Sequence, residues 1–225
     1  PLPQEATAGE ENAHEIPAAV TTRTDEPHAG ITADARPRAM QVHDSYLVVE
    51  TDEGITVIDQ HALHERIMYE HLRSRVLAQD VESQRLLLPE TIELSAGEAA
   101  LLVENAELLG QFGFGVEGFG GGTVLVTRYP VMLAKENLRQ LILDIVDQLS
   151  GAGEKPTRRD LIDELLHMMS CKAAIKAGDR LTPEEVDSLL QQRHLVDDAH
   201  HCPHGRPTAL VLSRADLDRQ FGRMG

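Results

Sequence analysis

The stretch DQHALHERIMYE, residues 59–70, lies where the sequence changes from strand-like to helix-like. The preceding run GITVI, residues 54–58, is apolar and β-branched, which is typical of a strand. Residues 61–77 are good helix formers and offer apolar side chains for burial, namely Leu63, Ile67 and Leu72. The pattern therefore predicts a strand that ends at Asp59 and leads into a helix carrying two histidines and two glutamates.

The remaining sequence predicts a mixture of strands and helices. MQVHDSYLVVE, residues 40–50, and GITVIDQ, residues 54–60, predict two strands around the turn TDEG. Further along we expect a strand, an amphipathic helix from about Ala96 to Leu109, and a strand pair broken by GFGGG. Two helices follow over residues 135–151 and 158–178, then a helix at 183–192 and a short strand at 208–214. The chain has no internal repeat, and the predicted fold class is α+β.

Composition limits the classes of function. The chain has 225 residues, 41% of them hydrophobic, enough for one substantial domain or two small ones. Its apolar runs are shorter than the roughly 20 residues of a membrane span, and its N-terminus does not resemble a signal peptide, so we expect a cytoplasmic protein without membrane contact. Residues 1–38 are acidic and poor in large apolar residues, which predicts a disordered linker or tail. This tail suggests that the chain is the C-terminal piece of a longer protein.

The charge and the cysteines narrow the chemistry further. A net charge of −16 disfavours a broad electrostatic grip on nucleic acid, because such binding depends on Lys and Arg neutralising phosphates. The chain has two cysteines, Cys171 and Cys202. Without an export signal, thiol or metal chemistry is a better expectation for them than a single disulfide.

The opening stretch contains candidate metal ligands. His61 and Glu65 are four residues apart and share a helix face, and Asp59 at the strand end can lean over the same spot. Imidazole and carboxylate groups are the usual ligands of zinc or manganese. In the alternative interpretation, Asp59 caps the helix, Glu65 pairs with Arg66 or Arg73, and His61 is exposed. Glu70 lies roughly opposite His61 on the helix, so a supporting or structural role suits it better.

The cysteine-containing segments add soft ligands. Cys202 and His204 form a Cys-x-His pair in the loop HHCPHGRPT, with His200 and His201 as possible spares. Cys171 lies on a helix one turn after His167, although a buried small side chain is the alternative. Arg206 suits a phosphate or carboxylate, or equally a structural salt bridge. The order His-x-x-His-Glu in HALHE differs from the helical motifs of zinc proteases, so peptidase chemistry gains no support.

Three of these segments together resemble a known family. DQHALHERIMYE matches the pattern DQHAxxExxxxE, SCKAAIKAG is similar to the family's ACR segment, and HCPHGRPT matches its CPHGRP segment. Their order is that of the C-terminal domain of endonuclease-type MutL mismatch repair proteins, and FGR at 221–223 resembles that family's Phe-x-Arg ending. The resemblance covers Met40 to Gly225. Ser170 departs from the family's usual Ala next to Cys171.

The resemblance implies an architecture and an activity. Residues 39–80 and 178–225 would form a dimerisation subdomain carrying most of the metal site, and residues 81–177 an external α/β subdomain with connecting helices. The implied activity is homodimerisation and metal-dependent nicking of duplex DNA, with zinc bound tightly and manganese or magnesium recruited for cleavage. The metal-site candidates become Asp59, His61, Glu65, Cys171, Cys202 and His204. Asp59, His61, Glu65 and Glu70 are the motif's candidate catalytic residues.

The resemblance also implies partners. MutL proteins grip DNA largely through an N-terminal ATPase domain, so this chain alone should bind DNA weakly, and ATP would be used only by that other domain. QRLLLP, residues 84–89, looks like the family's sliding-clamp-binding peptide, with Gln84, Leu87 and Pro89 as contacts; an ordinary strand entering a proline turn is the alternative. A MutS-type mismatch recognition protein is a further implied partner, and the implied location is cytoplasmic and nucleoid-associated. The competing hypothesis is a non-catalytic dimerisation and recruitment module with a structural zinc site, but the Asp-x-His-x-x-x-Glu set with Cys-x-His favours the enzyme.

Overall fold

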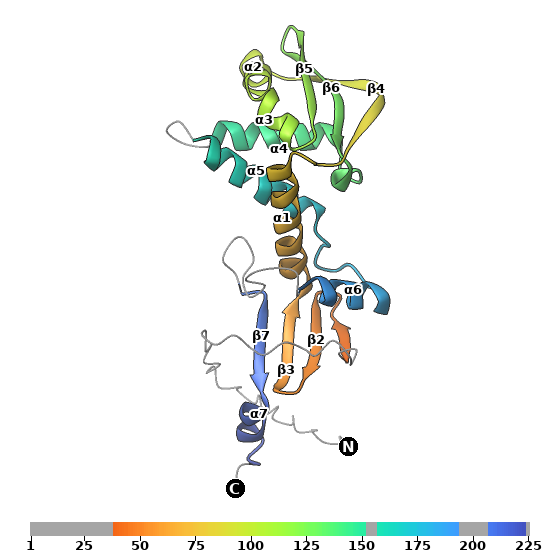
Figure 1. The fold of residues 1–225 in the computed structure, drawn as a ribbon, viewed down its shortest axis with the longest axis vertical. Coiled ribbons are helices and arrows are strands. Elements are labelled where there is room, and N and C mark those ends of the chain that lie inside the picture. The colour runs from red at the N-terminus through yellow and green to blue at the C-terminus, as the bar shows by residue number, and fades with distance from the viewer. Residues whose placement is uncertain (1–37, 152–156, 194–206, 224–225) are drawn as a thin grey trace, which may run out of the picture. The chain divides into compact units, whose positions relative to one another are not determined.

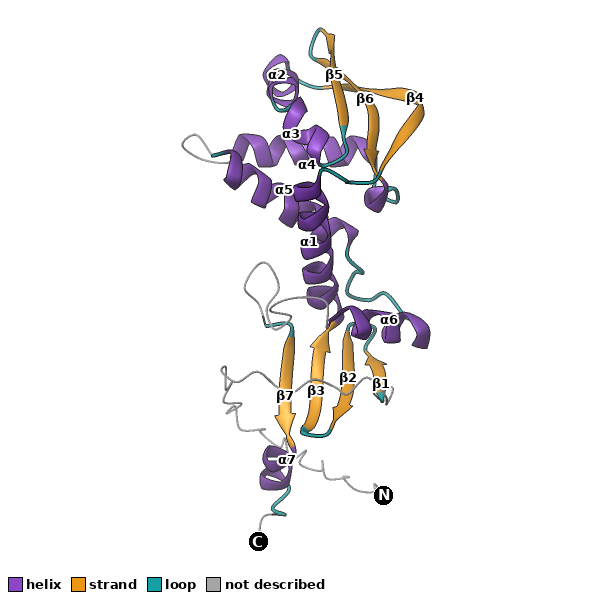
Figure 2. Cartoon of the chain, in the orientation of Figure 1, coloured by secondary structure: helices purple, strands orange, loops and turns teal. Residues whose placement is uncertain are grey.

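The structure is a computed structural model that describes residues 38–151, 157–193 and 207–223. Seven strands, seven α-helices and one short 3-10 helix lie in these ranges (Figures 1 and 2). In chain order they are β1 (Ala39–Val42), β2 (Tyr46–Thr51), β3 (Gly54–Asp59), α1 (Gln60–Ala78), β4 (Ser83–Glu93), α2 (Ala96–Glu104), α3 (Ala106–Gln111), β5 (Gly115–Gly120), β6 (Thr123–Pro130), η1 (Val131–Leu133), α4 (Leu138–Gly151), α5 (Arg158–Ala173), α6 (Pro183–Arg193), β7 (Ala209–Ser213) and α7 (Arg214–Gln220). The predicted α+β class is confirmed.

A four-stranded antiparallel sheet joins the two ends of the described region. Its strand order is β1-β2-β3-β7, so the C-terminal strand pairs directly with β3 (Figure 2). Alternate residues of β2 and β3 point into a core shared with α1 and α6, as period-two alternation requires. The fully or nearly fully buried members of this core are Leu47, Val49, Ile58, Leu63, Ile67, Val186, Leu189 and Leu190.

A second antiparallel sheet, of order β4-β6-β5, packs with α2 to α5 around a larger core. Phe112 and Phe114 are fully or almost fully buried there, beside Ile142 and Ile145 of α4. Helix α1 contributes to both cores, with Leu63 and Ile67 in the first and Leu72 and Val76 in the second. Our predicted subdomain boundaries stay a prediction.

The structure corrects two predicted elements. MQVHDSYLVVE contains two strands, β1 and β2, because His43 and Asp44 adopt left-handed φ values of 53° and 47° and turn the chain back. Asp tolerates that conformation better than most residues. The amphipathic helix of residues 96–109 is divided at Asn105, whose side-chain amide donates to the Leu101 carbonyl and ends α2. The other predicted helices and strands are found, but the helix predicted at 158–178 is shorter because it ends at Ala173, after which Ala174 is extended. Leu63, Ile67 and Leu72 are buried as predicted.

Short polar motifs fix where the helices begin. Ser95 and Asp160 take part in reciprocal capping boxes at α2 and α5, and Ser213 caps α7, a helix that the sequence analysis did not predict. Within the described residues, no helix combines the length and apolar character needed to cross a membrane.

Candidate metal centre

The first candidate ligand, Asp59, has a structural task at the junction of β3 and α1. Its Oδ1 accepts a hydrogen bond of 2.9 Å from the backbone N–H of Ala62, which caps α1. This part of the alternative interpretation is therefore correct. The half-buried carboxylate uses Oδ1 for this cap, and the hydrogen bond fixes the orientation of Oδ2.

His61 is held in one orientation and one tautomer. Its Nδ1 lies 2.7 Å from the backbone oxygen of Ile175. A carbonyl oxygen can only accept, so Nδ1 carries a proton, and in the neutral form of the ring the lone pair is on Nε2. Histidines that bind metals are commonly oriented in this way, through a hydrogen bond from the second ring nitrogen to a backbone carbonyl.

His64 holds the same peptide from the other side. The Ile175 N–H donates to His64 Nδ1 over 2.8 Å. Burial, followed by the neighbouring His61, lowers the pKa of His64 to about 4, so this ring is neutral at pH 7 and able to accept that bond. The two histidines together tie the start of α1 to the segment after α5.

Gln60 and Gln41 reinforce this junction from within. Gln60 is fully buried, and its Nε2 donates to the backbone oxygens of Asp44, Lys176 and Asp179 over 2.8, 3.1 and 3.0 Å. Its Oε1 accepts from Gln41 Nε2 over 2.6 Å. The amide pair thus joins the β1–β2 turn, the first residue of α1 and the segment between α5 and α6.

Glu65 and Cys171 lie, in the sequence, between two contacts that join α1 to α5 and the segment after it. His61 Nδ1 lies 2.7 Å from the backbone oxygen of Ile175, just beyond the end of α5, and the rings of Tyr69 and His167 are 5.0 Å apart. Glu65 is only 3% exposed and Cys171 is half-buried. A carboxylate this deeply buried is costly unless charge or hydrogen bonds balance it, which suits a ligand or a buried partner.

Glu70 faces a different set of charges. Its Oε1 lies 2.6 Å from an Arg66 nitrogen, and its Oε2 lies 3.7 Å from an Arg73 nitrogen. The two arginines named in the alternative interpretation thus form ion pairs with Glu70. These contacts favour a structural role for Glu70.

The candidate ligands in the C-terminal loop lie outside the described residues. This applies to Cys202, His204, Arg206 and the spares His200 and His201. Among the residues that the structure does describe, no group of three or more His, Cys, Asp or Glu side chains could hold a metal ion. Metal binding by the six-residue set therefore stays a prediction, in which the described residues supply one side of the site.

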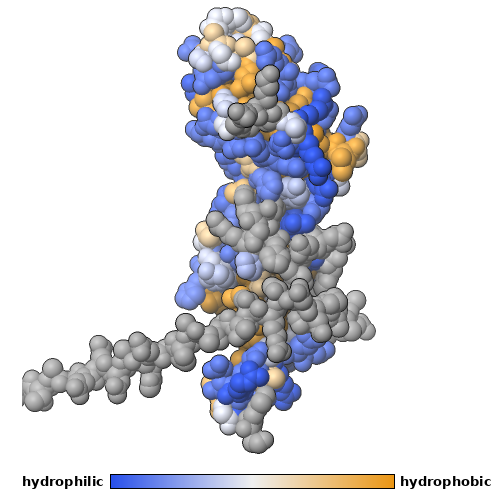
Figure 3. Space-filling view, turned by 90° about the vertical axis from the view of Figure 1, so that its left-hand side faces the viewer, coloured by the Kyte–Doolittle hydropathy of each residue, from blue (hydrophilic) through white to orange (hydrophobic). Residues whose placement is uncertain are grey.

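The segment QRLLLP forms an irregular part of β4. Pairing with β6 is regular at Gln84 and Arg85, breaks, and resumes at Glu90, so four residues of β4 face only Thr127 of β6. The bulge leaves Leu87 97% exposed and Leu88 81% exposed. Both are among the exposed hydrophobic side chains. Figure 3 shows one face of the molecule, whose surface is mostly hydrophilic. Clamp binding by Gln84, Leu87 and Pro89 stays a prediction.

Sequence reasoning missed the residues that orient the candidate ligands. Gln41, Gln60, His64 and Ile175 act through backbone contacts between segments more than 100 residues apart. Gln60 does stand inside the quoted motif, between two candidate ligands. Its full burial marks it as a structural residue, but a sequence pattern does not reveal that an amide side chain is buried.

The sequence matches the model of a known protein family. The family model described as the MutL C terminal dimerisation domain matches residues 39–181. The chain belongs to the MutL C-terminal dimerisation domain family. The DNA mismatch repair protein MutL of Phenylobacterium zucineum is 40% identical over 183 residues, 81% of this chain and 29% of that protein. Those of Chelativorans sp. and Mesorhizobium japonicum are both 39% identical, again over 81% of this chain, and over 30% and 29% of their own lengths.

The MutL family match covers only part of the candidate ligand set. Asp59, His61, Glu65 and Cys171 lie inside the matched range of the family model, whereas Cys202 and His204 lie after it. This MutL C-terminal chain spans less than a third of the length of these relatives.

Proposed function

We propose that this chain is the homodimerising, metal-dependent endonuclease domain of a MutL-type mismatch repair protein, which nicks one strand of duplex DNA. The observation that carries the proposal is the contact of His61 with Ile175, which leaves Nε2 of a fixed imidazole as the ligand atom. Buried Glu65 and the capped Asp59 stand on the same helix start. The alternative, a non-catalytic recruitment module, needs no such arrangement of carboxylates beside the histidine.

The candidate ligands suit two kinds of metal ion bound at one site. The thiolates of Cys171 and Cys202 and the imidazoles of His61 and His204 suit zinc, and the carboxylates of Asp59 and Glu65 suit manganese or magnesium. Bound there, a divalent ion would lower the pKa of water and offset charge on the phosphodiester. The chain's own contribution is to hold one imidazole tautomer and to keep two carboxylates at a fixed junction.

The four-stranded sheet supplies a surface for the homodimer. Its register aligns Met40, Val48, Val57 and Leu210 in one row across all four strands, on the face opposite the buried Leu47 and Ile58. Met40 is 62% exposed and Leu210 47% exposed. A continuous apolar row on an exposed sheet face is what a twofold interface would bury.

Further partners follow from the same proposal. The QRLLLP segment, with Gln84, Leu87 and Pro89, would dock on the replication sliding clamp, and its bulge leaves Leu87 and the adjacent Leu88 exposed for that contact. A MutS-type protein and the rest of the MutL chain would bring the DNA, because this acidic chain has little positive charge to hold it.

Metal analysis and a nicking assay on one preparation test the proposal. The purified chain should retain zinc after dialysis and convert supercoiled plasmid to the open circle when manganese is added. Zinc without nicking, even with the full-length parent protein, would favour the recruitment module. A chain that stays metal-free after zinc supplementation would overturn both versions.

A further inference from the structure

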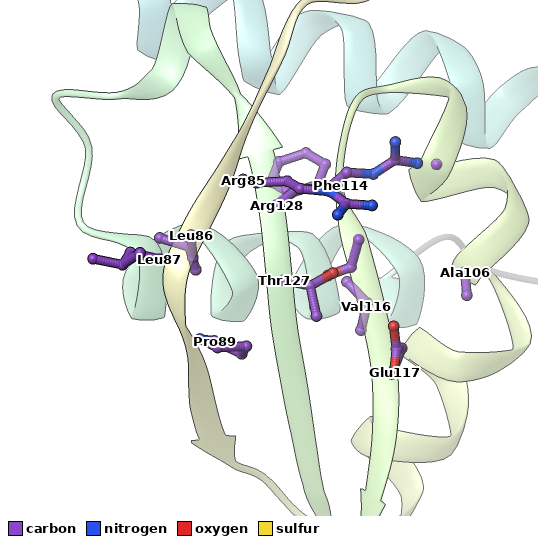
Figure 4. A pocket seen from close by; sticks show the side chains of 12 residues that line it. Arg85, Leu86, Leu87, Pro89, Ala106, Phe114, Val116, Glu117, Thr127 and Arg128 are labelled. Carbon is purple, nitrogen blue, oxygen red and sulfur yellow. The ribbon is translucent and has the colours of Figure 1, made fainter.

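Two arginines on neighbouring strands line the pocket beside the β4 bulge. Arg85 of β4 and Arg128 of β6 are register partners, and both line a pocket with Leu87, Pro89 and Thr127 (Figure 4). Figure 4 draws both arginine side chains among those that line the pocket. Like charges directly opposite one another on neighbouring strands destabilise a sheet.

The chain offers little to offset this repulsion. In the described part of the chain, neither arginine forms an ion pair or a side-chain hydrogen bond, although Glu117 lines the same pocket. An unfavourable pair of cations in a chain of net charge −16 is the kind of local conflict that marks a functional site.

The backbone is adapted to the position of Arg128. Gly115 of β5 is its register partner on the other side, and a Cβ there would lie 2.7 Å from Arg128 Cγ and 2.4 Å from Thr127 Oγ1. A larger residue at position 115 would therefore displace the side chains of Arg128 and Thr127. Both strand ladders shift register at Thr127, which opens the sheet at this point.

We propose that Arg85 and Arg128 form an anion site that takes a carboxylate side chain of the protein docked on Leu87 and Leu88. Guanidinium groups bind carboxylates and phosphates alike. The adjacent exposed leucines decide between these ligands, because they suit an apolar groove on a protein and contribute nothing to a phosphodiester contact. The net charge of −16 also opposes DNA at this surface.

This inference rests on the proposed docking of the sliding clamp at β4, so the probe is the purified cognate clamp. Its affinity for the whole chain is measured by calorimetry at low and high salt. Arg128→Gln and, separately, Arg85→Gln should each weaken binding roughly tenfold or more and flatten its salt dependence. Arg139→Gln on α4 removes an equal charge from an exposed site outside the pocket and should change affinity less than about twofold.

The outcomes separate the two proposals. If Arg85→Gln and Arg128→Gln bind the clamp like the wild type while Leu87→Ala loses binding, the docking surface stands and the anion site is wrong. If the wild-type chain does not bind the clamp, the docking proposal fails and takes this inference with it. If the arginine variants lose affinity for a duplex oligonucleotide and keep it for the clamp, the ligand is a phosphate and the proposal is overturned. Matching melting temperatures show that a variant is folded, and exposed Arg85 is the safer of the two substitutions.

Discussion

The Nδ1 atom of His61 lies 2.7 Å from the backbone oxygen of Ile175, so a residue at the start of α1 is oriented by a peptide 114 residues later. The same peptide donates its N–H to His64. The two rings therefore have separate tasks. The Ile175 contact leaves His61 Nε2 for the proposed metal, and His64 fixes the peptide that orients His61.

Asparagine substitutions separate these tasks. An Asn side chain places its amide near the Nδ1 position but has no group at Nε2. His61→Asn should keep the contact with Ile175 and the stability of the fold while zinc affinity falls 10-fold or more. His64→Asn should keep the acceptor for the Ile175 N–H and retain zinc. Competition with a chromogenic chelator measures both affinities, and equal zinc binding by His61→Asn would remove His61 from the ligand set.

Gln60 should be among the most sensitive polar positions for stability. Gln60→Leu has a similar size but removes, at a fully buried position, one donor to three backbone carbonyls and the acceptor of Gln41 Nε2. We expect the free energy of unfolding to fall by about 2–4 kcal/mol, measured by urea denaturation. Gln192→Leu, which loses only an exposed hydrogen bond to Ser188, should change it by less than about 0.5 kcal/mol. A Gln60→Leu protein as stable as wild type would show that the buried network contributes nothing.

Two glycine substitutions test the pairing of β3 with β7. Gly54 has φ +149°, and a Cβ there would lie 2.2 Å from the Leu212 oxygen. Gly54→Ala should therefore destabilise the protein by about 2 kcal/mol or more, because backbone must move. Gly97→Ala meets no atom within 4 Å and should be neutral or slightly stabilising. Thermal unfolding of both variants gives the comparison, and equal melting temperatures would argue against this strand pairing.

The outer row of the four-stranded sheet makes a prediction about assembly. Light scattering of the wild-type chain should give about twice its 24.8 kDa mass. Leu210→Glu places a charge in the exposed apolar row of the proposed interface and should give a monomer. Leu77→Glu, at a 77% exposed position on α1, is the matched control and should stay dimeric. Dimers of equal strength in both variants would move the interface to another surface.

The sequence predicts the strand-to-helix junction at Asp59 but not the distant residues that contact it. The strand ending at Asp59, the helix after it and the buried Leu63 and Ile67 follow from local periodicity, which needs no knowledge of distant residues. The turn at His43 and Asp44 was missed because its left-handed residues are neither Gly nor Asn. The partner of His61 and two of the partners of Gln60 were missed because they are backbone atoms beyond residue 170, whose approach depends on the packing of α1 against α5. Likewise, QRLLLP gave a candidate motif, but the bulge and the Arg85–Arg128 pair depend on strand register.

Asp59 allows the most direct test of the central claim, because Asn can replace it as a helix cap but not as an anionic ligand. In Asp59→Asn the hydrogen bond to Ala62 can persist, so melting temperature and dimer mass should match the wild type. Asp80→Asn, which removes an exposed charge paired with Arg75 near the other end of α1, controls for the change in net charge. The measurement is nicking of supercoiled plasmid in manganese by the three proteins at equal metal content. We predict a loss of at least 100-fold in Asp59→Asn and wild-type activity in Asp80→Asn; wild-type nicking by Asp59→Asn would contradict the proposed role of this site.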